Sequence, residues 1–132
     1  MATGSLKLLF DEHFSHLHVT FVNQQSRLAH MQHMRPIGWS GQPDTQWIPL
    51  AVRQGFVIVM GARNERTRGF TTTDLKAMDA RVVLVGPFWD HMNRWERAKW
   101  LVASIERITE IASALPPGSV ELIDGRGGTK SL

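Results

Sequence analysis

Two adjacent carboxylates, Asp11 and Glu12, directly follow the short apolar run at 8–10. Neighbouring like charges at the end of a buried strand repel each other and lose solvation, unless a positive group lies beside them. A third acid, Asp44, precedes the segment that leads into the apolar run at 56–60. Carboxylate oxygens suit Mg²⁺ or Mn²⁺, and two such ions about 4 Å apart can hold a phosphodiester for attack by water. The three acids are therefore candidate metal ligands, and the alternative is a set of solvated or helix-capping acids.

The apolar pattern predicts how these acids are positioned. Continuous apolar or β-branched runs predict strands, and periodic apolar positions predict helices. The expected strands are 6–10, 29–34, 56–60, 80–86 and 119–123. The expected helices are 14–28, 48–54 after a turn at 43–47 (or one helix kinked at Pro49), 71–79 capped by Thr72 or Thr73, and 89–113 with Met92, Trp95, Val102 and Ile105 on its apolar face. This order predicts a single-domain α/β sandwich, with a mainly parallel central sheet flanked by helices, an ordered core at 6–123 and a mobile tail at 124–132.

Parallel strands place their carboxyl ends at one edge of the sheet, where ligands usually bind in such folds. Asp11 and Glu12 follow the first strand, and residues 61–64 follow the strand at 56–60. Asp44 opens the segment before that strand and can reach the same edge. We therefore expect these carboxylates to converge.

Arginines fall beside the expected acidic edge. Arg63, Arg66 and Arg68 follow the strand at 56–60, and Arg35 lies in the earlier loop. Arginine makes bidentate contacts with phosphate, so these side chains can form a phosphate-binding rim, and an ordinary solvated loop is the alternative. Trp39, in a glycine-rich loop, is the candidate for base stacking. The other tryptophans considered, Trp47, Trp95 and Trp100, are expected to be structural.

Five histidines cluster at the start of the chain: His13, His16, His18, His30 and His33. They follow no established zinc-site spacing, so isolated polar or surface roles are expected, with one of them available to position substrate near Asp11. The 132 residues contain no cysteine, which excludes disulfides and thiolate chemistry. The formal charge of +3 is compatible with nucleic acid. No membrane-length apolar run or signal-peptide pattern is found, and a cytoplasmic protein is expected.

Two quoted stretches carry a family resemblance. The run "LKLLFDEHFSHL", followed by "PDTQWIPLAVRQGFVIVMGAR", resembles the PIN-like nucleases, specifically a small subgroup near the VapC-type toxins. The match is strongest over residues 6–66. It implies a PIN-like three-layer sandwich, Mg²⁺- or Mn²⁺-dependent endoribonuclease activity on RNA, and a cognate antitoxin protein as partner. Asp11 would be the primary metal ligand, Asp44 the second core carboxylate and Glu12 a second or outer acid.

The chain departs from the family pattern at Ala62, where relatives carry an aspartate. Alanine cannot bind a metal ion, so ion binding and catalysis are expected to be weakened. A natural loss of function and an introduced Asp→Ala change both account for this residue. Retention of Asp11, Glu12, Asp44 and Arg63 favours the second explanation.

Three functions therefore remain open. The first is a toxin-type ribonuclease in an inactive form, with Arg63 and Arg66 holding phosphates beside the scissile bond. The second is a non-catalytic PIN-like module that binds RNA or a protein partner. The third is a structural protein whose acids are simple caps. The sequence leaves open whether the chain forms a homo-oligomer, and which RNA or antitoxin it meets.

Overall fold

The structure, a computed structural model, describes residues 6–62 and 71–132. The strands are β1 (Lys7–Phe10), β2 (His30–His33), β3 (Val57–Gly61), β4 (Arg81–Val85), β5 (Ser119–Ile123) and β6 (Thr129–Ser131). The helices are α1 (His16–Gln25), α2 (Asp44–Arg53), α4 (Thr72–Ala77), the 3-10 helix η2 (Pro87–His91) and α5 (Arg94–Ala114).

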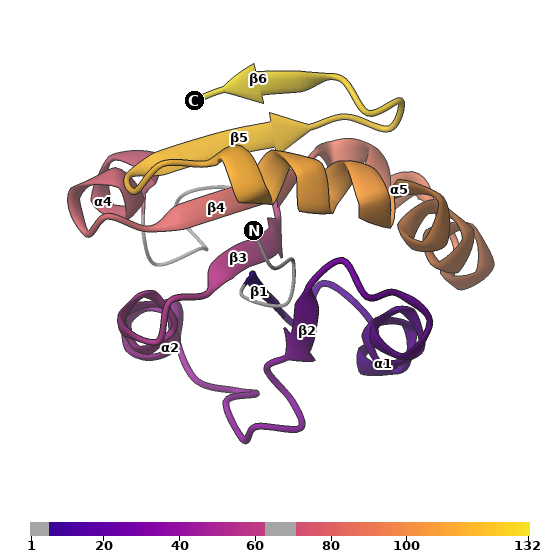
Figure 1. Cartoon of the computed structure of the whole chain (residues 1–132), viewed down its shortest axis with the longest axis horizontal. Helices are drawn as coiled ribbons and strands as arrows, with labels where there is room; N and C mark the ends of the chain where they lie inside the picture. The colour runs from indigo at the N-terminus through magenta and orange to yellow at the C-terminus, as the bar shows by residue number, and fades with distance from the viewer. Residues whose placement is uncertain (1–5, 63–70) are drawn as a thin grey trace.

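One sheet organises these elements, with the strand order β2-β1-β3-β4-β5-β6 (Figure 1). Strands β1 to β5 are parallel to their neighbours, and only β6 is antiparallel, pairing with β5. The central strands β3 and β4 are buried almost throughout, because helices cover both faces of a parallel sheet. The predicted α/β class and mainly parallel sheet are confirmed.

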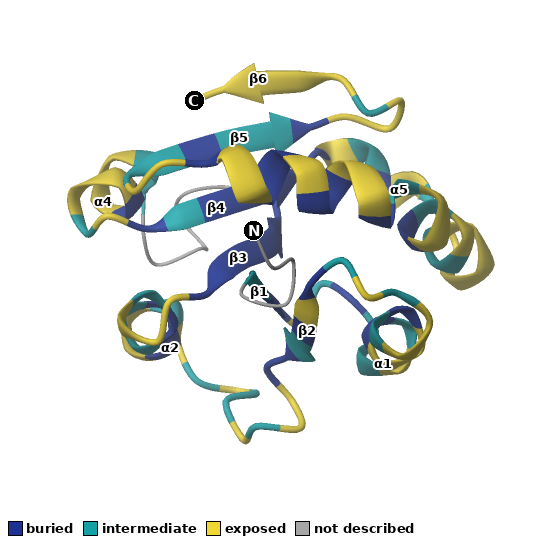
Figure 2. Ribbon diagram, viewed as in Figure 1, coloured by how far each residue is buried: buried dark blue, intermediate teal, exposed yellow. Residues whose placement is uncertain are grey.

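Two separate hydrophobic clusters lie on opposite faces of the sheet. Because successive side chains of a strand point to opposite faces, Leu8 and Phe10 join one cluster whereas Leu9 joins the other. The first cluster packs the sheet against α1 and α5, and the second packs it against α2 and α4 (Figures 1 and 2). The helices therefore lie on both sides of the sheet. A functional site at the sheet can then form only in the loops at its edges.

The helix α2 fits the alternative of one helix through Pro49 and not the turn followed by a short helix. It begins at Asp44 rather than at Ile48, and Pro49 lies inside it. The backbone N–H groups of Gln46 and Trp47 both bond to the carbonyl of Pro43, so the first turn is helical in spite of the later proline. Proline lacks an N–H and crowds the preceding turn, and burial of Trp47 and Ile48 against the sheet offsets that cost.

Two further helix boundaries were predicted wrongly. Thr71, rather than Thr72 or Thr73, caps α4 through a reciprocal pair of hydrogen bonds with Asp74. The predicted helix 89–113 is divided into η2 and α5, and Asn93 caps α5 in the same reciprocal way with Glu96. In both helices the cap side chain accepts from a backbone N–H that has no partner within the helix.

The segment expected to be a mobile tail contains a strand. β6 pairs antiparallel with β5, and Asp124 stabilises the turn between them by accepting from the N–H groups of Arg126 and Gly128. The polar sequence of β6 shows no apolar strand pattern, because an exposed edge strand needs no apolar face. Among the helices that the structure describes, none has both the length and the apolar character to cross a membrane.

Candidate functional site

An acidic pocket lies at the carboxyl edge of the sheet. Its volume is about 240 Å³. It is lined by Asp11, Glu12, His13, Met34, Gln42, Asp44 and Trp47. The turn after β1 supplies the first three residues, and α2 supplies the last two. The structure thus brings the three predicted acids, Asp11, Glu12 and Asp44, to one pocket.

Asp11 is the most deeply placed of these acids, with 3% of its surface exposed. Its Oδ1 accepts a hydrogen bond of 3.0 Å from the backbone N–H of His13, and its own N–H donates to the carbonyl of Val59 at 3.2 Å. Burying a carboxylate is costly unless hydrogen bonds compensate for lost water. The turn after β1 therefore holds the Asp11 side chain in a defined orientation beside β3.

Asp44 occupies the first turn of α2. Its Oδ1 accepts a hydrogen bond of 3.0 Å from the indole Nε1–H of Trp47, which is buried. Pro43 precedes it as the N-cap residue and makes no capping bond through its side chain. An acid in the first turn is stabilised by the positive end of the helix dipole, so Asp44 is held by both its local helix and a core tryptophan.

Glu12 is exposed and joins two loops. Its Oε2 lies 3.4 Å from the backbone nitrogen of Gly41, which donates the hydrogen bond from the loop between β2 and α2. Glu12 also lines a second pocket of about 220 Å³ on the α1 side of the acidic pocket. The two pockets are therefore adjacent and share this carboxylate.

The second pocket carries two arginines against one carboxylate, and we call it the basic pocket. Its charged or titratable lining residues are Glu12, His16, His33, Arg35 and Arg94. Arg35 was predicted as part of a phosphate-binding rim, whereas Arg94, at the start of α5, was not considered. Its position after β4, at the same edge of the sheet, is the signal that could have identified it. Arg63, Arg66 and Arg68 lie outside the described residues.

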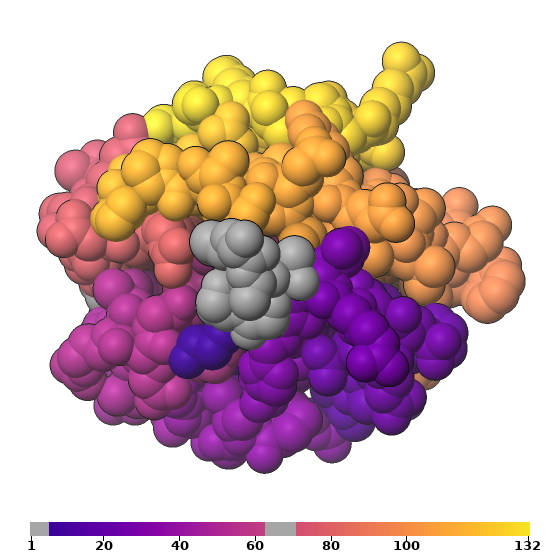
Figure 3. Space-filling view, viewed as in Figure 1, coloured from indigo at the N-terminus to yellow at the C-terminus, as the bar shows by residue number. Residues whose placement is uncertain are grey.

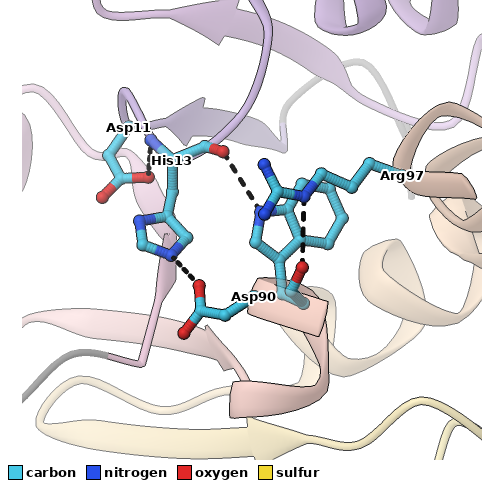
Figure 4. A network of polar contacts seen from close by, with 5 residues as sticks. Asp11, His13, Asp90 and Arg97 are labelled. Atoms are coloured by element: carbon cyan, nitrogen blue, oxygen red, sulfur yellow. Dashed lines mark hydrogen bonds and ion pairs between the residues drawn. The ribbon is translucent and has the colours of Figure 1, made fainter. Parts of the chain in front are cut away.

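His13 connects the acidic pocket to the 3-10 helix η2 (Figure 4). Its Nε2 lies 3.5 Å from Oδ1 of Asp90 in η2, and its carbonyl accepts from the indole N–H of Trp89 at 3.2 Å. The Nε–H of Arg97 in turn donates to the carbonyl of Trp89 at 3.1 Å. Sequence reasoning considered His13 only as one of five histidines and missed Asp90, because their contact joins residues 77 positions apart.

His33 is buried, so of the two expected roles it fits the isolated polar one and not the surface one. Its Nδ1 accepts from the backbone N–H of Arg35 at 3.0 Å, and its Nε2 lies 2.8 Å from the carbonyl of Phe14. These partners require a neutral ring that is protonated on Nε2. Burial lowers the pKa of His33 below 6.5, and this outweighs the opposing effect of the bond to Phe14.

Ala62 follows β3 on the face of the sheet that also holds Met34 and Trp47. It is partly buried against their cluster, and its N–H donates to the carbonyl of Val85 at 2.8 Å. Met34 and Trp47 both line the acidic pocket. A longer side chain at position 62 would therefore extend along the same face as these two residues.

The tryptophans considered from the sequence differ in how far they are buried. Trp47 is buried as expected, and Trp100 packs against Phe88 and Trp89. Trp39 is partly buried against the cluster of α2, so part of its ring is committed to packing. Trp95 is 69% exposed, so its predicted structural role on a buried apolar face was wrong.

The acidic pocket matches the donor chemistry of Mg²⁺ or Mn²⁺ in part. Its three carboxylates are hard oxygen donors, and such ions need only one or two carboxylates when they keep their waters. Within residues 6–62 and 71–132, however, no three His, Asp or Glu side chains lie close enough together to hold an ion jointly. Direct ligation by all three acids would thus require their side chains to move.

Comparisons of this chain with protein-family models, with curated proteins and with solved structures found no significant match.

Proposed function

We propose that this protein is a PIN-like, metal-dependent endoribonuclease of the toxin type, whose activity in this chain is weakened by Ala62. One observation carries the proposal: three carboxylates from two separate segments line a single pocket at the carboxyl edge of a parallel sheet. A basic pocket that shares Glu12 lies beside it. Acidic and basic pockets side by side suit a substrate whose phosphates are negatively charged but whose cleavage needs a cation.

Asp11 and Asp44 would hold Mg²⁺ or Mn²⁺, and Glu12 would act as a direct or water-mediated ligand. A bound ion of this kind polarises a phosphate oxygen and lowers the pKa of an attacking water. The hydrogen bonds from His13 N–H to Asp11 and from Trp47 to Asp44 fix one oxygen of each acid. Hydrogen-bond donors that are held in place by the fold orient metal-binding carboxylates.

The basic pocket would bind phosphates of the RNA on one side of the scissile bond. Arg35 and Arg94 come from different segments, after β2 and at the start of α5. Two guanidinium groups around one hollow can contact consecutive phosphates, and arginine is suited to this by its planar set of donors. The RNA backbone would then pass Glu12 and enter the acidic pocket.

The second candidate is a non-catalytic module that binds RNA, or an antitoxin-like protein partner, through the same two pockets. Ala62 favours it, because position 62 follows the strand next to Asp11 and offers no carboxylate. The two candidates make the same prediction for binding and differ for cleavage.

The deciding experiment measures Mn²⁺-dependent cleavage of a mixed RNA pool by the chain as given and by Ala62→Asp. We expect cleavage by Ala62→Asp and little or none by the chain as given. The control is Asp11→Asn in the Ala62→Asp background, which should be inactive. Cleavage that survives this control would come from a contaminating nuclease. If no variant cuts but RNA binding persists, the non-catalytic module is the correct function.

A further inference from the structure

Exposed large apolar side chains gather on two neighbouring helices, away from the acidic pocket. The exposed fractions are 57% for Leu17, 51% for Phe21, 69% for Trp95 and 52% for Val102. The first two lie on α1 and the last two on α5. Single exposed apolar residues are common, but a cluster on adjacent elements indicates an interaction site.

These side chains line a groove between α1 and α5, which we call the α1–α5 groove. One part has a volume of about 830 Å³ and a second part about 330 Å³, and they share Phe21 and Val102. Figure 2 shows the exposed end of α5 projecting beyond the sheet, and Figure 3 shows this end beside α1 at the right of the molecule. Along α5 the groove runs from Arg94 to Glu106, about 18 Å at 1.5 Å per residue. Its length equals about three turns of a helix.

The rim of the groove is mainly positive. Arg94 and Lys99 border the larger part, and Arg27 and Glu106 border the smaller part. The Lys99 ammonium lies 5.8 Å from the centre of the Trp95 ring, so positive charge is placed directly beside the most exposed apolar residue. Burial and the charge of Arg94 both lower the pKa of His18, which also lines the groove.

We propose that the α1–α5 groove binds an amphipathic helix of a partner protein, with apolar residues facing the groove and acidic residues facing Arg94 and Lys99. An apolar floor with a charged rim is the usual arrangement for binding a helix in a groove, and apolar anchors at i, i+3 or i+4 and i+7 match its length. The complementary charges would favour association and orient the helix.

Charge argues against a second copy of this chain as the occupant. A two-fold dimer buries the same patch of both subunits in one interface, so two rims that each carry more positive than negative charge would be brought together. Like charges at an interface are unfavourable. Nucleic acid fits less well, because among the apolar residues only Phe21 and Trp95 offer aromatic stacking, whereas Leu17, Val102 and the groove alanines offer neither stacking nor hydrogen bonds.

A displayed library of helical peptides tests the proposal with the full chain. The peptides carry Leu or Ile at a fixed i, i+3, i+4, i+7 stripe and random residues elsewhere, and a scrambled-stripe library is the control. We expect selection to enrich Asp and Glu at the positions flanking the stripe. Enrichment of Lys or Arg, or equal enrichment of scrambled peptides, would overturn the proposal.

Variants then locate the binding site of a selected acidic peptide. Trp95→Ser and Phe21→Ser should each weaken binding by at least about ten-fold, because central aromatic residues dominate such interfaces. Arg94→Glu should weaken it as well, whereas the matched charge reversal Lys130→Glu, on the exposed strand β6, should leave affinity unchanged. Equal effects of the two charge reversals would show a non-specific attraction and contradict the proposal.

Sedimentation equilibrium of the chain alone tests the remaining possibility, that a second copy of this chain occupies the groove. We expect the α1–α5 groove to be accessible at concentrations used for peptide binding. A dimer that Trp95→Ser converts to monomer would identify a second copy as the occupant and would overturn the proposal. Because none of these measurements uses RNA cleavage or Ala62, their outcome is independent of the ribonuclease proposal.

Discussion

His13 Nε2 lies 3.5 Å from Asp90 Oδ1, and this contact joins the turn after β1 to the 3-10 helix after β4 (Figure 4). The strand between them, β3, ends in Gly61, and the His13 ring lies directly against it. A Cβ at position 61 would overlap the ring atoms of His13. The missing side chain of Gly61 is therefore what allows His13 to reach across β3 to Asp90.

Replacing Gly61 by alanine should displace the His13 ring. Forcing a methyl group into a packed site typically costs about 1–3 kcal/mol of unfolding free energy. We expect urea denaturation to show a loss in this range for Gly61→Ala. In the double variant Gly61→Ala, His13→Ala the ring is removed, and the loss caused by the added methyl group should largely vanish. Additive effects of the two substitutions would show that they do not interact.

Removing the N-cap of α5 should destabilise the fold moderately. The Asn93 side chain accepts from the N–H of Glu96 at 2.9 Å, and Glu96 Oε1 accepts from the N–H of Asn93 at 3.0 Å. Loss of such a cap to alanine typically costs about 1 kcal/mol, whereas glycine costs only a few tenths. We therefore expect Asn93→Ala to have a lower melting temperature than Asn93→Gly. The reverse order would mean that the cap contributes little.

Protonation of His33 should destabilise the folded protein. Burial lowers its folded pKa below the ordinary 6.5, so in that range the unfolded chain binds more protons. The contribution of His33 to stability is thus fully present above pH 6.5 and is lost as pH falls through the folded pKa. Free energies of unfolding measured across this window should fall less steeply for His33→Gln than for the unchanged chain.

His18→Gln is the matched control for this titration. The pKa of His18 is also lowered, by burial and by Arg94, but its ring has no hydrogen bond as buried as that between His33 and Phe14. We expect His18→Gln to flatten the pH dependence less than His33→Gln does. Identical profiles for His33→Gln and the unchanged chain would contradict the assignment of a neutral, buried His33.

Charge reversal in the basic pocket should weaken RNA binding and its dependence on salt. Each phosphate contact that is lost reduces the slope of log affinity against log salt by about 0.7 for a single strand. We expect Arg35→Glu and Arg94→Glu to reduce both affinity and slope, and Lys130→Glu to change neither beyond the effect of net charge. Fluorescence anisotropy with a labelled RNA at several salt concentrations measures both quantities. Unchanged slopes for all three variants would exclude the basic pocket as the RNA site.

Most of the sheet could be predicted from the sequence alone. The apolar runs that form β1, β3 and β4 are continuous, because their residues are buried on both faces, and few other structures accommodate such runs. Parallel pairing then follows from the intervening helices, and it places Asp11, Glu12 and Asp44 near one edge. The acids of the candidate site were therefore predictable from strand order.

Tertiary structure decided what periodicity alone could not. Trp95 and Val102 follow a helical apolar pattern, but α5 extends past the sheet, and these residues border the α1–α5 groove instead of the core. A period specifies which face of a helix is apolar, and only the position of the helix determines what covers that face. The His13–Asp90 contact and the burial of His33 likewise depend on side chains from distant segments, and no local pattern encodes such contacts.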